Sequence, residues 1–209
     1  MISPPDALSP EDFTRAVDAA IRERRTRKVL DGPGPDGAAF QKALRESLAL
    51  AGMAPFHFAR ADEVPEPWRF RVFVGDGLAR IERELTAADV LYGKLPAIFA
   101  GAGAVVQASW LPEGRPERDW EHLAAAASAV QNFFLAMHAR GFGSYWCSAP
   151  VLGEKAASDV LGVGADEAYL GTLFFGVPLD AAAETERGYS GKMNARRTPA
   201  AAWSDWTES

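Results

Sequence analysis

Residues 120–150 read WEHLAAAASAVQNFFLAMHARGFGSYWCSAP, and this stretch decides the fold. Its apolar side chains recur at steps of three and four residues, which is the period of an α-helix. These positions are Leu123, Ala126, Ala127, Val130, Phe133, Phe134 and Met137. Alanine and serine fill most positions between them, so nearly the whole circumference is apolar or small, which predicts a buried helix. The run is too short for a membrane span, and Gln131, Asn132 and His138 interrupt it.

The predicted helix is followed by a glycine-rich exit, residues 141–148, which read GFGSYWCS. Gly141 can adopt the left-handed conformation that commonly ends a helix. The two glycines lack β-carbons, so the backbone can approach another group closely. We therefore expect a short strand or extended turn over residues 145–148.

The whole chain has 209 residues, 48% hydrophobic side chains and a formal net charge of -6. These values predict one domain over residues 1–209 with a sizeable core, and the negative charge argues against a nucleic-acid partner. The N-terminal residues lack the basic start and apolar run of a signal peptide. The only cysteine, Cys147, cannot form an internal disulfide, and we expect a cytoplasmic protein without membrane contact. The histidines (His57, His122 and His138) are scattered, so we expect no metal site.

A first helix is predicted near the N-terminus, where Ser9 is a suitable cap and a proline follows it. Its apolar face consists of Phe13, Ala16, Val17, Ala20 and Ile21. Residues 22–28 then read RERRTRK and place five basic side chains at the end of this helix. The cluster is either a solvated face that complements the helix dipole or an anion site. In an anion site, Arg24, Arg25 and Thr26 would offer guanidinium groups and a hydroxyl to a phosphate or an electron-rich ring edge.

The remaining chain alternates predicted helices and strands. Helical periodicity predicts one helix that ends at Gly52, one over residues 77–91 and one over residues 153–161. Apolar or alternating runs predict strands over residues 68–74, 98–110 and 168–178. Residues 179–209 form a tail without strong periodicity, in which Trp203 and Trp206 need a surface to cover. This order of elements predicts an α+β fold, with helices flanking one sheet in three layers.

Several segments, in order along the chain, resemble the nitroreductase family of flavin enzymes. They are RRT at 24–26, AGMAPFHF at 51–58, EPWRFRV at 66–72, ARGFGSYW at 139–146, LFFGVP at 173–178 and RTP at 197–199. RRT resembles the family's Arg-Arg-Ser segment, and AGMAPFHF and EPWRFRV resemble the Ala-Pro-x-His segment and the Gln-Pro-Trp strand entry of its small bacterial members. ARGFGSYW resembles the family's glycine-rich exit from the central helix. LFFGVP and RTP resemble its Gly-x-Pro strand end and its Arg-x-Pro tail. The resemblance covers residues 20–206 and depends on the ordered set rather than on one motif.

The resemblance implies an FMN-dependent oxidoreductase that passes hydride from NADH or NADPH through the flavin to a small electrophilic acceptor. Such acceptors are nitroaromatics, quinones or activated alkenes, reduced in a ping-pong cycle. It further implies a three-layer α-β-α sandwich and an intertwined homodimer in which both subunits contribute to each flavin site. The tail over residues 179–209 would wrap the partner subunit, which would account for its tryptophans and for the all-round apolar helix. The flavin carries the chemistry, so no catalytic residue is assigned.

Carried over by position, eight residues are expected to bind the flavin: Arg24, Arg25, Thr26, His57, Trp146, Cys147, Ser148 and Arg197. The first three would meet the phosphate, the ribityl chain and the pyrimidine edge. His57 would reach across from the other subunit, residues 146–148 would line the flavin, and Arg197 would meet the phosphate. Cys147 is expected to be an inert thiol whose backbone faces the flavin.

Two departures from the family pattern bear on the site. The segment over residues 58–66 is longer and interrupted by proline, and Glu66 replaces the usual Gln. Met53 stands where small members place an Arg, so one flavin contact is lost or supplied from elsewhere. Two other functions stay open: specialised chemistry such as flavin cleavage or dehalogenation, and a non-catalytic dimeric interaction protein.

Overall fold

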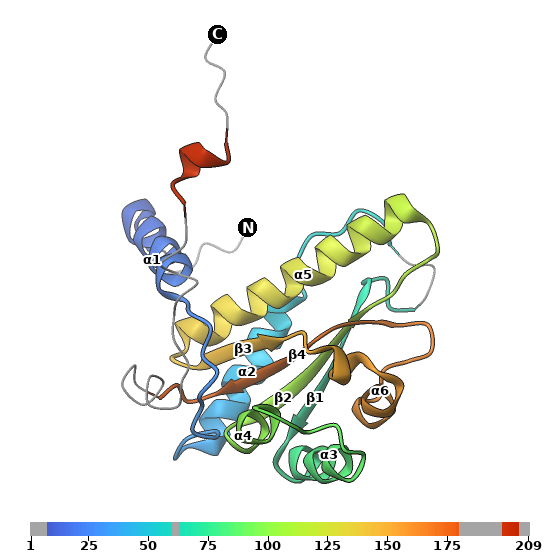
Figure 1. Ribbon diagram of the computed structural model, residues 1–209. Helices are drawn as coiled ribbons and strands as arrows, with labels where there is room; N and C mark the ends of the chain where they lie inside the picture. Colours follow the sequence, from blue (N-terminus) through green and yellow to red (C-terminus); the bar gives the residue numbers. More distant parts are fainter. Residues whose placement is uncertain (1–7, 60–62, 180–197, 205–209) are drawn as a thin grey trace.

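The structure is a computed structural model that describes residues 8–59, 63–179 and 198–204 (Figure 1). An antiparallel sheet of four strands forms the middle layer, in the order β1-β2-β4-β3. The strands are β1 (Trp68–Val74), β2 (Ala104–Trp110), β3 (Gly143–Cys147) and β4 (Ala168–Gly176). β1 and β2 pair along their whole length, from Trp68 opposite Trp110 to Val74 opposite Ala104. The last strand in the chain, β4, therefore lies between β2 and β3.

Helices cover both faces of this sheet (Figure 1). α2 (Gly37–Ala51) and α5 (Pro116–Ala139) lie on one face, against a core that includes Val106, Leu173 and Phe175. The other face carries α3 (Gly75–Ala87), α4 (Leu95–Ala100) and α6 (Lys155–Leu161). The predicted α+β, three-layer architecture is confirmed.

The central helix α5 is buried as its sequence predicts. Phe133, Val130 and Met137 are fully enclosed, as are the small residues Ala126 and Ala129 between them. Because alanine adds little bulk, α5 can lie close to both the sheet and α2. The helix ends as expected: Gly141 follows it at φ 83°, and the N–H of residue 142 donates to the carbonyl of residue 137.

The strand predicted over residues 98–110 is wrong in its first half. α4 occupies Leu95–Ala100, and β2 begins only at Ala104. Leu95, Ile98 and Phe99 are buried at steps of three and four, so the run has helical spacing that its apolar, β-branched composition concealed. A β-carbon at Gly103 would lie 2.7 Å from the backbone nitrogen of Pro33, so this glycine permits a close chain crossing.

Other element boundaries differ from the predictions by a few residues. The helix predicted over 77–91 is α3, which begins and ends earlier. The helix predicted over 153–161 is divided into a 3-10 turn, η1 (Pro150–Gly153), and α6. The strand predicted over 168–178 ends at Gly176. In the tail, the described part contains one 3-10 turn, η3 (Ala200–Ala202), and Trp206 lies outside the described residues.

α1 (Pro10–Glu23) stands apart from the three layers, beside the C-terminal end of α5 (Figure 1). Ser9 caps it as predicted, since its side chain accepts a hydrogen bond from the N–H of Asp12. The apolar face, however, is exposed and is not covered by the described residues. The exposed fractions of Phe13 and Ile21 are 61% and 58%, and no residue of α1 is buried.

Candidate functional site

The candidate site lies where the basic segment after α1 meets the edge strand β3. Thr26 forms a parallel bridge with Ser144, and the N–H of Arg27 donates to the Ser144 carbonyl at 2.8 Å. Further along, Leu30 bridges to Pro178, beyond the end of β4. Residues 26 and 27 thus lie beside the first half of β3, and residues 29–32 then run past the end of β4 to Ala102. The bridge between Thr26 and Ser144 joins residues more than 100 positions apart in the chain.

The cations of this segment lie at the surface around β3. Arg25 is exposed, and its guanidinium turns back to the carbonyls of Arg22 and Arg24, the latter at 3.0 Å. The Lys28 ammonium stands over the Tyr145 ring, 5.1 Å from its centroid. Thr26 is exposed and adds a hydroxyl. Guanidinium, ammonium and hydroxyl donors together form a set that suits a phosphate group or another anion.

The charges of this segment act on His138, in the last turn of α5. The pKa of His138 is lowered from its usual value chiefly because of burial. Glu23 raises this pKa, and Arg24, Arg27 and Arg25 each lower it. These arginines therefore lie near the C-terminal end of α5.

Trp146 and Cys147 turn their side chains to opposite faces of the sheet, as alternation along a strand requires. The Trp146 indole packs edge-on against Phe134 of α5, with ring centroids 6.3 Å apart, and its Nε1–H donates to the Leu170 carbonyl at 3.1 Å. Cys147 is 3% exposed and its thiol lies among the residues under α6. Burial of this free thiol matches the prediction of an inert cysteine. Ser148 follows the strand and is exposed.

His57 lies at the other end of the molecule. It is exposed, and its Nδ1 is 3.0 Å from a carboxylate oxygen of Glu121, in the early part of α5. Since α5 is continuous, Glu121 and His138 are separated by about 25 Å at 1.5 Å per residue. One chain therefore brings Thr26 to Ser144 and places Arg24, Arg25 and Arg27 near His138, but it keeps His57 far from these residues. Arg197 lies outside the described residues.

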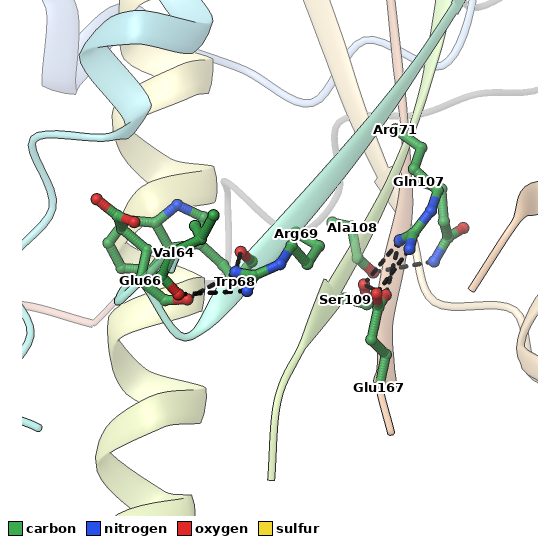
Figure 2. A network of polar contacts seen from close by, with 9 residues as sticks. All are labelled: Val64, Glu66, Trp68, Arg69, Arg71, Gln107, Ala108, Ser109 and Glu167. Carbon is green, nitrogen blue, oxygen red and sulfur yellow. Dashed lines mark hydrogen bonds and ion pairs between the residues drawn. The ribbon is translucent and has the colours of Figure 1, made fainter. Parts of the chain in front are cut away.

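The structure also shows where Met53 and the end of the longer segment over residues 58–66 lie. Met53 is 73% exposed after α2. The guanidinium of Arg69 donates to the carbonyls of Glu66 and Trp68 at 2.7 Å and to that of Val64 at 3.3 Å (Figure 2). Arg69 therefore anchors the described end of the longer loop to the first residue of β1.

Sequence reasoning missed a buried polar network on the α6 side of the sheet. Arg71 on β1 forms a two-point ion pair with Glu167, which also accepts a hydrogen bond from Ser109 (Figure 2). Gln107 accepts a hydrogen bond from Thr172 at 3.1 Å, and both are fully buried. In the sequence, only Gln107, inside the otherwise apolar run AVVQA, could have indicated this network, because a buried amide requires hydrogen-bond partners.

Among the helices of the described part of the chain, none has both the length and the apolar composition needed to cross a membrane. Within the same residues, His, Cys, Asp and Glu side chains do not gather in a group of three or more that could hold a metal ion.

Residues 5–177 match the model of the Nitroreductase family. The chain belongs to the nitroreductase family. It is 27% identical over 164 residues to the "Putative NAD(P)H nitroreductase YdjA" of Escherichia coli (strain K12), which covers 74% of this chain and 84% of that protein.

Solved structures show the same fold. A nitroreductase-like family protein from Bacillus cereus superposes with a TM-score of 0.72 at 21% identity, covering 99% of this chain and 100% of that one. The FMN-dependent nitroreductase NfnB from Mycobacterium smegmatis, solved in complex with NADPH, superposes with a TM-score of 0.70 at 16% identity. That match covers 94% of this chain and 100% of NfnB.

Proposed function

We propose that this protein is a homodimeric FMN-dependent oxidoreductase that uses NADH or NADPH to reduce a small electrophilic acceptor. The observation that carries the proposal is the bridge between Thr26 and Ser144, in a member of the nitroreductase family. It brings Thr26, the last residue of the proposed anion-binding segment 24–26, alongside the strand that precedes Ser148. A flavin mononucleotide has an anionic phosphate at one end and a flat ring at the other, and this edge offers cations and an extended backbone.

The residues of the chain would bind and orient the cofactor. Arg24, Arg25 and Thr26 would hold the phosphate, the ribityl chain and the pyrimidine edge, and Arg197 is proposed as a further phosphate ligand. The backbone of residues 146–148 would line the ring. A guanidinium near the pyrimidine edge would favour negative charge on the reduced ring and so raise its reduction potential.

The redox chemistry is what bound FMN supplies: hydride taken from NADH or NADPH, then electrons passed to a nitroaromatic, quinone or activated alkene in a ping-pong cycle. The chain contributes placement, exclusion of water and positive charge. This is why no side chain is assigned as a general acid or base.

The dimer is proposed for two structural reasons. The apolar face of α1 is exposed in a single chain, and burial of a large apolar side chain stabilises by about 1.5–3 kcal/mol. His57 and the arginines lie at opposite ends of α5. In a two-fold assembly, His57 of one chain would complete the site of the other, and the tail over residues 179–209 would wrap the partner.

The first test is an absorbance spectrum of the purified protein, before and after adding FMN and then NADH or NADPH without oxygen. A flavin band that is retained, and that one nucleotide bleaches, supports the proposal and identifies the hydride donor. A protein that stays colourless with excess FMN would overturn it. Consumption of the FMN itself under oxygen would support the specialised flavin chemistry instead.

A further inference from the structure

β4 contains an irregularity next to the proposed flavin-lining segment. Ala108 pairs with Gly171, but the next residue on β2, Ser109, pairs with Tyr169. Leu170 therefore has no partner of its own on β2 and forms a β-bulge. Bulges bend a strand and redirect its side chains and carbonyls, and they are frequent beside active sites.

The carbonyl of the bulged residue binds the site tryptophan. Trp146 Nε1–H donates to the Leu170 carbonyl at 3.1 Å, from the neighbouring strand β3. The indole fills the space that a side chain at Gly171 would need. A β-carbon at Gly171 would lie 2.0 Å from Nε1 and 2.5 Å from Cδ1 of Trp146, closer than atoms can approach. Gly171 is thus required for the present position of the indole.

Tyr169, on the other flank of the bulge, binds the backbone of the next residue on β3. Its hydroxyl lies 3.1 Å from the Cys147 carbonyl and 3.3 Å from Thr172 Oγ1. The Thr172 hydroxyl donates its proton to Gln107 Oε1 at 3.1 Å. The Tyr169 proton is therefore the one available to the Cys147 carbonyl, which can only accept. Behind the ring, a β-carbon at Gly153 would lie 2.8 Å from Tyr169 Cδ1, so η1 closes over it.

The two contacts reach β3 from opposite faces of the sheet. The indole lies on the α5 side with Phe134, and the phenol ring lies on the α6 side with the residues around Leu161. The last two residues of β3, which directly precede the exposed Ser148, are thus held in position from both faces of the sheet.

Resting on the proposed function, we propose that the β4 bulge positions the flavin-lining backbone of residues 146–148, with Tyr169 and Gly171 as positioning residues. Neither residue is assigned a contact with the flavin. They act through Trp146 and the Cys147 carbonyl, and they set where the ring of the cofactor comes to lie.

The test compares FMN affinity, the visible circular dichroism of bound flavin and the flavin midpoint potential in matched variants. In Gly171→Ala the β-carbon displaces the indole, and the Kd for FMN is expected to rise about tenfold or more, with an altered dichroism spectrum. In a Trp146→Leu background the ring is gone, and the β-carbon meets only the Cys147 carbonyl at 3.2 Å, on a backbone at φ 159°. The same glycine change is therefore expected to raise the Kd by a clearly smaller factor than in the wild type. The matched control is Gly77→Ala, because a β-carbon at Gly77 meets nothing within 4 Å.

Tyr169→Phe keeps the ring and removes one oxygen, so it carries the test if Gly171→Ala does not fold. Loss of the bond to the Cys147 carbonyl is expected to raise the Kd about two- to tenfold and to shift the midpoint potential. Tyr92→Phe, at a 61% exposed position, is its control.

The outcomes separate this proposal from the proposed function. If wild-type protein binds FMN and both Gly171→Ala and Tyr169→Phe match their controls in all three measurements, the positioning role alone is overturned. If Gly171→Ala raised the Kd for FMN by the same factor in the wild type and in the Trp146→Leu background, the proposal that Gly171 acts through Trp146 would be overturned. A wild-type protein that takes up no FMN overturns both proposals.

Discussion

Arg71 and Glu167 face each other across the sheet in a two-point ion pair, with Nη1 2.7 Å from Oε2 and Nη2 2.6 Å from Oε1. The Glu167 side chain is only 6% exposed, whereas that of Arg71 is 31% exposed. The pair joins β1 to the loop before β4, across the intervening strand β2.

Removing one partner of this pair should destabilise the fold. Arg71→Leu leaves a buried carboxylate without its counter-charge, which is expected to lower the free energy of unfolding by about 2–3 kcal/mol, moderated by the partial exposure of Arg71. Urea unfolding at fixed protein concentration measures the change. In the double variant Arg71→Leu/Glu167→Leu the unpaired charge is gone, so most of the loss should be recovered. A double variant as unstable as the single one would contradict this account.

The same carboxylate should make stability depend on pH in the acid range. Burial acts to raise the pKa of Glu167, but hydrogen bonds from Arg71 and Ser109 outweigh it, and the net pKa is lowered. A lowered folded-state pKa gives stability that is present above the unfolded value, about 4.3, and that is lost as pH falls through the folded value. The difference in unfolding free energy between wild type and Glu167→Gln should therefore be largest near neutral pH and shrink below about pH 4. A difference independent of pH would exclude this linkage.

At alkaline pH, Tyr169 should dominate a second loss of stability. Burial raises its pKa to about 12. A raised folded-state pKa means that the neutral phenol stabilises the fold below the unfolded value of about 10, and that this is lost as pH rises toward the folded value. Comparing the stability of wild type and Tyr169→Phe between pH 9 and about pH 11.5 checks this. The unfolding free energy of the wild type should fall more over that interval than that of Tyr169→Phe. If the two free energies fell in parallel, this prediction would be contradicted.

His138 should report on anion binding at the arginine segment. Burial is the main cause of its lowered pKa; Glu23 raises the pKa, and Arg24, Arg27 and Arg25 lower it. An FMN phosphate or inorganic phosphate bound by Arg24 and Arg25 would offset their charge, so the pKa of His138 should rise on binding. Nuclear magnetic resonance titration of the imidazole, with and without phosphate, measures the shift. In Arg24→Gln/Arg25→Gln the shift should vanish, and an unchanged pKa in wild type at saturating FMN would argue against this anion site.

The exposed face of α1 should be needed for assembly. Phe13→Asp with Ile21→Asp places two charges where the proposed partner covers apolar surface, so the protein is expected to become monomeric in size-exclusion chromatography with light scattering. Tyr92→Asp, an equally exposed aromatic position on the opposite side of the sheet, serves as the control and should leave the mass unchanged. Retention of a dimer in the double variant would assign this face another role.

The sequence predicted those parts of the structure that depend on local pattern. α5 could be recognised because its small and apolar residues repeat over six turns, and β1 because Arg alternates with aromatic and Val residues. The run over residues 98–110 was misassigned because it includes only the last three residues of α4, a helix of under two turns, and these are too few to show its helical spacing. No local pattern could show that Thr26 meets Ser144 or that His57 lies at the far end of α5, because both facts depend on how distant segments pack. Arg71 and Glu167, 96 residues apart, could be paired only in three dimensions.

The strand order also determines when the sheet can form during synthesis. β2 pairs early with β1, yet its second neighbour, β4, follows about 58 residues later, which at ribosomal rates of about 5–20 residues per second is a delay of about 3–12 seconds. During that interval one edge of β2 presents unpaired backbone groups beside Val105 and Val106, a surface prone to aggregation. Nascent chains of this protein should therefore depend on chaperones until β4 has left the ribosome.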